Sequence, residues 1–238
     1  MFNERSDRWT VTTDDGKRYD AHYVVMATGS LSNARTPDFK GLSSFRGKTY
    51  HTGQWPHEGV DFTGLRVGVV GTGSSAIQSI PVIAEQAKHL TVFQRTPNFS
   101  LPARNHDLTP DYQKSWKEDY PERRRMAREE TRNGVYGAQP TKGALEDTAE
   151  DRKKVYDEEW ERGGLHFLAS YNNLVLDKQA NDTAAEYVRQ KIASVVKDPE
   201  VAKILQPTTY PIGTKRICLD IDYFETFNRD NVTLVDTR

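Results

Sequence analysis

The residues best suited to chemistry form a glycine-rich loop in the first half of the chain. Gly71, Gly73 and Ala76 fit the G-x-G-x-x-G/A spacing of a dinucleotide-binding loop. The two glycines permit a tight turn and let a pyrophosphate approach the backbone, and the small third residue lets helix and strand pack closely. An ordinary glycine turn is the alternative. The residues that we predict to bind the cofactor here are Gly71, Thr72, Gly73, Ser74, Ser75 and Ala76.

The flanking sequence supplies the elements that must position this loop. The β-branched run Val67–Val70 is typical of a buried parallel strand, and Leu90–Phe93 predicts a second short strand. Between them, apolar residues recur at helical spacing: Ile77, Ile80, Ala84 and Ala87. The order is strand, loop, helix, strand, so the helix directs its free N–H groups and positive dipole end at the phosphates.

The second strand ends in Gln94-Arg95-Thr96, where an NAD-binding unit usually carries an acidic residue for the ribose 2′-hydroxyl. A cation at this place suits a 2′-phosphate, so the sequence predicts NADP rather than NAD. We therefore include Arg95 and Thr96 among the cofactor-binding residues. Arg95 as a surface charge is the alternative.

A second cationic site follows much later, in the loop from Tyr210 to Arg216. Lys215 and Arg216 precede the strand-like run Ile217–Leu219. Neighbouring residues of a strand face opposite ways, so the two cations cannot share one task if the strand has begun. On the residues alone, a pair of solvated loop cations is the simpler interpretation.

Composition excludes several classes of function. The 238 residues carry a net charge of −1, so no basic excess favours nucleic acid or an anionic membrane. No apolar run of membrane-spanning length and no signal peptide is present, and we expect no metal site. The single cysteine, Cys218, fits a reducing cytoplasm, and its apolar surroundings predict a buried structural thiol.

The first thirty residues predict a β-hairpin. Arg8–Thr13 alternates, Asp14-Asp15-Gly16 is a turn signal, and a second strand should run from Tyr19 to Ala27. It ends in Ala27-Thr28-Gly29, which resembles the second nucleotide-contacting turn of flavin disulfide-reductase-like folds. A plain strand end is the alternative. No glycine loop precedes Trp9, so we expect the chain to begin inside an FAD-binding domain.

A longer pattern makes the resemblance specific. Phe45-x-Gly47-x-x-x-His51-x-x-x-Trp55-Pro56 is similar to the fingerprint of type I flavoprotein Baeyer–Villiger monooxygenases at every fixed position. Flavin-containing and N-hydroxylating monooxygenases carry a related pattern that lacks the Trp-Pro ending. The segment Phe93–Pro97 also looks like that family.

This resemblance implies an enzyme that uses NADPH, FAD and O₂ to insert oxygen beside a ketone carbonyl, giving an ester or lactone. It implies that Lys215 binds the 2′-phosphate and that Arg216 is catalytic, stabilising the flavin peroxide anion. It implies that His51 tunes domain motion, and that Trp55, Thr28 and Gly29 belong to the cofactor sites. A histidine satisfied within a linking loop is the alternative for His51.

The predicted fold class is α/β. Residues 1–56 are expected to be a partial FAD-domain segment and linker, and 57–238 a Rossmann-like (βαβ) NADP-binding domain with a helical insertion at about 106–206. Within the insertion, Thr183 and Glu186 predict a helix start by a capping box, and Asp198-Pro199 predicts another helix reaching Leu205.

The expected behaviour is that of a fragment truncated at both ends. We expect it to bind NADP(H), to hold FAD poorly, and to be inactive alone. The alternatives are a non-catalytic NADP-binding module and a related N- or S-oxygenating flavin monooxygenase. Trp55-Pro56 argues against the last.

Overall fold

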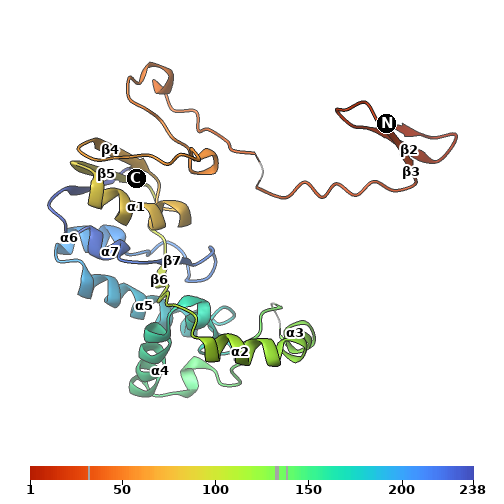
Figure 1. Ribbon diagram of the computed structural model, residues 1–238. Helices are drawn as coiled ribbons and strands as arrows, with labels where there is room; N and C mark the ends of the chain where they lie inside the picture. Colours follow the sequence, from red (N-terminus) through yellow and green to blue (C-terminus); the bar gives the residue numbers. More distant parts are fainter. Residues whose placement is uncertain (32, 132–133, 138) are drawn as a thin grey trace. The chain divides into compact units, whose positions relative to one another are not determined.

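The computed structural model describes residues 1–31, 33–131, 134–137 and 139–238 (Figure 1). The chain divides into two compact units, Met1–Gly59 and Val60–Arg238.

The N-terminal unit contains a small antiparallel sheet in the order β1-β2-β3, formed by β1 (Phe2–Asn3), β2 (Arg8–Thr12) and β3 (Arg18–Ala21). Gly16 turns the chain with a φ of +79°, and its N–H donates to the Thr13 carbonyl at 2.9 Å. The predicted hairpin is therefore confirmed. Two short 3₁₀ helices follow, η1 (Leu42–Ser44) and η2 (Thr52–Gln54).

The predicted extension of this strand to Ala27 is wrong. β3 ends at Ala21, and residues 23–29 form no strand. Val25 is 87% exposed and Met26 is 76% exposed. The physical reason is that β-branched composition favours a strand only where a neighbour supplies hydrogen bonds and buries a face. No strand among the described residues pairs with this segment.

The C-terminal unit is built on a parallel sheet in the order β4-β5-β8, formed by β4 (Arg66–Val70), β5 (His89–Gln94) and β8 (Val232–Asp236). Helix α1 (Ser74–Gln86) connects β4 to β5 and continues unbroken through Pro81. Its Ile77, Ile80 and Ala84 are fully buried. The predicted βαβ unit is confirmed (Figure 1).

The expectation of a buried first strand needs correction. Val70 is 65% exposed, and Val67 and Val69 are half-buried. β4 lies at the edge of the sheet in the described chain, because β5 is the strand that pairs with it. An edge strand buries less of its side-chain surface than a strand with two neighbours.

In the sequence, a block of helices lies between the two strands of a second parallel pair, β6 (Ser100–Pro102) and β7 (Cys218–Asp220). Because Ser100 is paired with Cys218, the block leaves and rejoins the unit at one place. Helix α7 (Tyr223–Thr226) follows β7. The block comprises α2 (Pro110–Glu118), α3 (Tyr120–Glu129), η3 (Ala144–Glu146), α4 (Ala149–Arg162), η4 (Gly164–Ala169), α5 (Lys178–Val195) and α6 (Pro199–Leu205).

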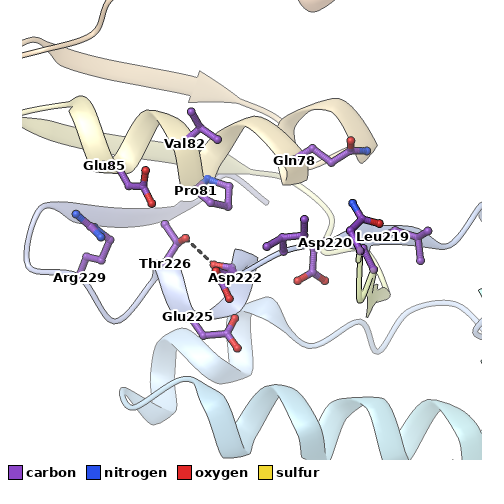
Figure 2. Close-up of a pocket in the computed structure, with 13 residues that line it drawn as sticks. Gln78, Pro81, Val82, Glu85, Leu219, Asp220, Asp222, Glu225, Thr226 and Arg229 are labelled. Carbon is purple, nitrogen blue, oxygen red and sulfur yellow. Dashed lines mark hydrogen bonds between the residues drawn. The ribbon is translucent and has the colours of Figure 1, made fainter. Parts of the chain in front are cut away.

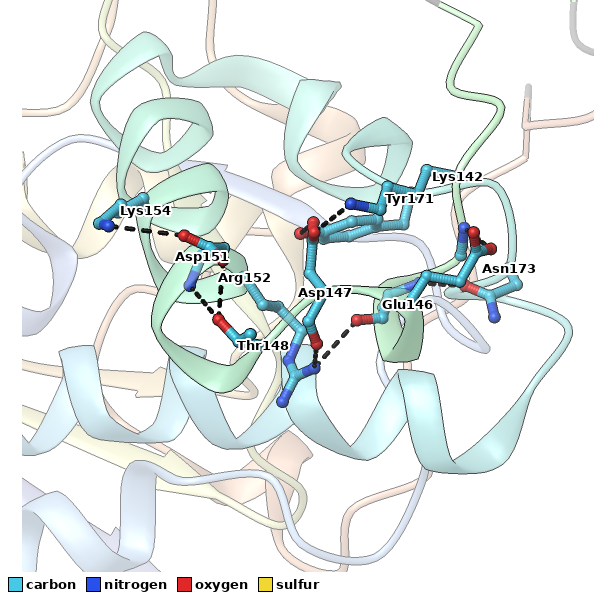
Figure 3. A network of polar contacts seen from close by, with 11 residues as sticks. Lys142, Glu146, Asp147, Thr148, Asp151, Arg152, Lys154, Tyr171 and Asn173 are labelled. Atoms are coloured by element: carbon cyan, nitrogen blue, oxygen red, sulfur yellow. Dashed lines mark hydrogen bonds and ion pairs between the residues drawn. The ribbon is translucent and has the colours of Figure 1, made fainter.

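A network of hydrogen bonds and ion pairs lies around the N-terminus of α4 (Figure 3). The Tyr171 hydroxyl donates to the Asp147 carboxylate at 2.7 Å, and Lys142 forms an ion pair with the same carboxylate. Arg152 donates to the carbonyls of Ala144 and Asp147 at 2.9 and 3.1 Å. Arg152 thus supplies a hydrogen-bond donor to two backbone carbonyls.

One of the two predicted helix starts is wrong and the other is confirmed. α5 begins at Lys178, and its N-cap is Asp177, whose carboxylate accepts the N–H of Ala180 at 3.0 Å. Thr183 lies inside the helix and donates to the Ala180 carbonyl. Asp198 caps α6 as expected, accepting from Glu200 and Val201.

Cys218 is 4% exposed on β7, so the predicted burial is confirmed. Burial raises the pKa of its thiol. Among the described residues, no helix combines the length and the apolar character needed to cross a membrane.

Candidate nucleotide-binding site

The glycine loop is an open turn at the carboxyl end of β4. Gly71 has a φ of +94°, which favours glycine, and its N–H donates to the Phe93 carbonyl at 2.9 Å. A Cβ added at Gly71 or Gly73 would meet no heavy atom within 4 Å. A glycine is therefore needed at Gly71, and both positions leave the outer surface of the turn accessible to a ligand.

The N-terminus of α1 presents free donors next to this turn. The N-cap is Gly73, which has no side chain to accept a hydrogen bond from the first turn. The first N–H groups of a helix have no intrahelical acceptor. Ser74 and Ser75 are exposed there. Such a terminus suits an anion, since the helix dipole and the free donors favour negative charge.

The Thr72 side chain is hydrogen-bonded within the protein. It is 4% exposed, and its hydroxyl donates to the Thr96 carbonyl at 3.2 Å. Its own carbonyl accepts the Asn98 side-chain amide at 2.5 Å. The threonine therefore fastens the glycine loop to the segment after β5.

Arg95 lies one residue beyond the end of β5, with an exposed side chain. Val70 is paired with Phe93, so Gly71 and Arg95 both lie just past the carboxyl ends of adjacent parallel strands. Ligands of open α/β sheets bind outside this edge. Within the described part of the chain, the Arg95 guanidinium has no hydrogen-bond or ion-pair partner.

Tyr210 brings the second cationic loop to the same place. Its hydroxyl donates to the Pro97 carbonyl at 2.8 Å and contacts the Asn98 side-chain oxygen at 3.3 Å. Burial raises the pKa of this hydroxyl to about 12, so it remains a neutral donor at physiological pH. The Lys215 ammonium lies 4.3 Å from the centre of the Tyr210 ring.

Lys215 and Arg216 both precede the strand, since β7 begins at Cys218. The argument from opposite strand faces therefore does not apply to them. The turn before them uses Gly213, whose φ is +89°, and the Thr214 N–H donates to the Pro211 carbonyl at 3.3 Å. Both cations are exposed, and the Arg216 side chain has no polar partner among the residues described.

Sequence reasoning missed two residues of this arrangement, Asn98 and Tyr210. An asparagine after a strand and a tyrosine before a proline have no distinctive spacing. Pro211 and Gly213 identify the segment as a loop, but they do not show that Tyr210 contacts Pro97 and Asn98.

Among the predicted residues of the N-terminal unit, His51 and Trp55 contact residues close to them in the sequence. The His51 ring Nδ1 accepts the Gly53 N–H at 3.0 Å and so caps η2. Trp55 is 37% exposed, with its ring 5.9 Å from that of Tyr50. Gly29 has a φ of +75°, as a tight turn after Thr28 requires. The capping contact fits a satisfied loop histidine and leaves a role in domain motion untested.

The two cofactors fit this chain differently. The open glycine turn, the uncapped helix end and the exposed cations suit a phosphorylated dinucleotide. For FAD, the described residues offer the turn at Thr28-Gly29, which follows an exposed segment without a strand.

A cavity in the C-terminal unit lies elsewhere. It has a volume of about 650 Å³ and lies between α1 and the β7–α7 segment (Figure 2). Asp220 lines it and is 8% exposed, accepting hydrogen bonds from the Ser100 hydroxyl and from the Tyr223 N–H at 3.4 Å. Burial raises the pKa of this carboxyl to about 6. None of the predicted cofactor-binding residues lines this cavity.

Residues 2–161 match the family model described as pyridine nucleotide-disulphide oxidoreductase. The chain belongs to the pyridine nucleotide-disulphide oxidoreductase family. This agrees with a parallel sheet whose first loop is open to a dinucleotide. The predicted α/β class with a Rossmann-type nucleotide fold is confirmed by the match and by solved structures in complex with FAD and NADP.

The relatives of this chain include a Baeyer–Villiger monooxygenase and other monooxygenases. The chain is 40% identical to the 2-oxo-Δ(3)-4,5,5-trimethylcyclopentenylacetyl-CoA monooxygenase of Pseudomonas putida, over 100% of this chain and 45% of that protein. It is 38% identical to a Baeyer–Villiger monooxygenase of Pseudooceanicola batsensis, over 100% of this chain and 43% of that protein. A phenazine N-monooxygenase of Lysobacter antibioticus is 36% identical.

A solved structure of oxidised steroid monooxygenase bound to NADP is 50% identical, with a TM-score of 0.92, over 99% of this chain and 45% of that one. The chain therefore spans a little under half the length of the relatives it matches. The resemblance inferred from the fingerprint is confirmed.

Proposed function

We propose that this chain provides the NADP(H)-binding site of an FAD- and NADPH-dependent Baeyer–Villiger monooxygenase. Such an enzyme inserts one oxygen atom of O₂ next to a ketone carbonyl, giving an ester or lactone. One observation carries the proposal: the open glycine loop, the loop bearing Arg95 and the loop bearing Lys215 are joined through Asn98 and Tyr210. A cytoplasmic location is part of the proposal.

The residues divide the binding task by charge and geometry. The N–H groups at the start of α1, from Ser74 to Ala76, hold the pyrophosphate, which approaches over Gly71 and Gly73. Arg95 and Lys215 hold the 2′-phosphate, where each adds a charge-assisted contact. Thr72 and Thr96 keep the loop in place. When bound, NADPH supplies the hydride and FAD supplies the chemistry with O₂.

Arg216 is proposed as the catalytic cation. An exposed guanidinium without a partner in the described chain is available to stabilise negative charge that develops on a reacting oxygen. His51 is proposed to act on domain motion, and Trp55, Thr28 and Gly29 to line the cofactor sites. These roles rest on the family likeness. We expect the chain alone to bind NADP(H) and to be inactive.

A second candidate is N-oxygenation, which the phenazine N-monooxygenase among the relatives favours. Trp55-Pro56, the ending that fits Baeyer–Villiger enzymes, argues for ketone oxidation. A non-catalytic NADP-binding module is the third candidate. If a protein that carries this chain oxidises NADPH in the presence of a ketone but not of an aromatic nitrogen heterocycle, N-oxygenation and the non-catalytic module are both excluded.

The proposal is tested by calorimetric titration of the chain with NADP⁺ and, separately, NAD⁺. We expect a clear preference for NADP⁺. Arg95→Ala and Lys215→Ala should each weaken NADP⁺ binding by roughly 1.5–3 kcal/mol, the range for hydrogen bonds to charged groups. NAD⁺ binding should change little, because NAD⁺ lacks the 2′-phosphate.

Arg66→Ala is the matched control. Arg66 is an exposed arginine of the same unit at the amino end of β4, the opposite end of the sheet from Arg95. Its removal should leave both affinities unchanged. Equal affinity for the two nucleotides in the parent chain would contradict the proposed site.

A further inference from the structure

We infer that Tyr210 is a positioning residue that sets NADP⁺ selectivity by holding the Lys215 ammonium beside the glycine loop. The inference rests on the proposed NADP(H) site and deepens it. Tyr210 itself touches no phosphate, because its effect passes through Lys215.

The first step is the contact between cation and ring. The Lys215 ammonium lies 4.3 Å from the centre of the Tyr210 ring, well within cation–π range. Lys215 is exposed and has a flexible four-carbon stem. Ordering such a side chain on binding costs conformational entropy, so a ring that holds it beforehand strengthens binding.

The second step is that the ring itself is fixed. The Tyr210 hydroxyl donates to the Pro97 carbonyl at 2.8 Å. The ring meets that of Phe99 edge to face, with 5.6 Å between centres, and Phe99 is 2% exposed. A buried aromatic neighbour and a hydrogen-bonded hydroxyl together fix both the tilt and the position of the ring.

The third step connects Tyr210 to the glycine loop. Its hydroxyl contacts the Asn98 side-chain oxygen at 3.3 Å, and the Asn98 amide donates to the Thr72 carbonyl at 2.5 Å. Thr72 in turn donates to the Thr96 carbonyl, next to Arg95. These contacts tie the position of Lys215 to the glycine loop, which receives the pyrophosphate, and to the loop that carries Arg95.

The backbone of the loop between Tyr210 and Lys215 is also held in place. Buried Asn181 of α5 accepts the Ile212 N–H at 3.1 Å and donates to the Ile212 carbonyl at 2.8 Å. The backbone is therefore held at Ile212, and the lysine side chain returns over the ring. This makes the ring, rather than the loop backbone, the part that selects the lysine conformation.

The test is a double-mutant cycle in the full 238-residue chain, with NADP⁺ and NAD⁺ affinities measured by calorimetry. Tyr210→Leu removes the ring, and Lys215→Met removes the charge. We expect Tyr210→Leu to weaken NADP⁺ binding roughly 3- to 10-fold and to leave NAD⁺ unchanged. In the Lys215→Met background, Tyr210→Leu should cause no further loss.

Tyr210→Phe keeps the ring and removes the hydroxyl anchor, so we expect a smaller loss, confined to NADP⁺. It also decides the question if Tyr210→Leu does not fold. The inference is overturned if the Tyr210 variants weaken the binding of both nucleotides equally, or if NADP⁺ affinity is unchanged or improved. It is also overturned if Tyr210→Leu still lowers NADP⁺ affinity in the Lys215→Met background.

The failure of the proposed function is a different result. In that case the parent chain shows no preference for NADP⁺, and Lys215→Met leaves its affinity unaltered. A parent chain that prefers NADP⁺ and depends on Lys215, but not on Tyr210, rejects this inference alone.

Discussion

At the scale of the residue, Asp220 is a buried carboxylate outside the nucleotide site. Its pKa is about 6, against 3.8 for an ordinary aspartate, mainly because burial disfavours the charged form. The Ser100 hydroxyl and the Tyr223 N–H act in the opposite direction. The folded state therefore binds this proton more tightly than the unfolded state, and stability falls as pH rises through about 6.

Asp220→Asn should remove this dependence. Between about pH 5 and about pH 8, we expect the parent chain to lose roughly 1–1.5 kcal/mol of unfolding free energy relative to Asp220→Asn. The measurement is urea denaturation of both chains across that range. The difference between the chains matters, because other groups titrate in both. A constant difference across the range would contradict a raised pKa at Asp220.

At the scale of the element, α5 fixes the loop that carries the cations. Asn181 lies on its first turns, is 4% exposed, and bonds Leu174 and Ile212 through both atoms of its amide. The loop between α6 and β7 therefore depends on a helix that is about thirty residues earlier in the chain.

Asn181→Ala should destabilise the C-terminal unit by about 3 kcal/mol, because it leaves buried backbone groups at Leu174 and Ile212 without partners. Ser194→Ala, an exposed position on the same helix, should change stability by less than about 0.5 kcal/mol. Thermal and urea unfolding measure both. A loss at Asn181 no larger than that at Ser194 would show that the helix does not hold the loop.

At the scale of the whole molecule, the two units differ in their secondary structure and burial. The segment from Tyr23 to Leu31 has no strand or helix and exposes Tyr23, Val25, Met26 and Leu31. The unit from Val60 onward has paired strands and helices such as α1 and α5 that contain buried residues. The predicted boundary at residues 56 and 57 lies near the division at Gly59, and the domain assignment stays a prediction.

Limited digestion with chymotrypsin should therefore cut first within residues 23–31. Proteases cleave exposed segments that lack hydrogen-bonded structure. We expect a fragment containing Val60–Arg238 to persist, identified by mass spectrometry. Its lifetime should increase with NADP⁺, because a ligand that binds the folded state stabilises it. First cleavage inside α1 or β5 would contradict this order.

The sequence by itself determined the elements whose signals are contiguous. The strand, glycine turn and helix from Val67 to Gln86 follow from β-branched composition, two glycines and helical spacing. The turn at Gly16 and the N-cap at Asp198 also follow from residues close to them in the sequence. These features depend on dihedral preferences and short-range hydrogen bonds, which a stretch of a few residues can specify without distant partners.

Only the tertiary structure decided what joins these elements. β8 pairs with β5 from the far end of the chain, and Tyr210 meets Pro97 across 113 positions. Tertiary contacts also overrode local signals. Val24–Ala27 finds no strand partner among the described residues. The physical reason is that strand pairing and side-chain anchoring depend on partners distant in sequence, which local composition does not specify.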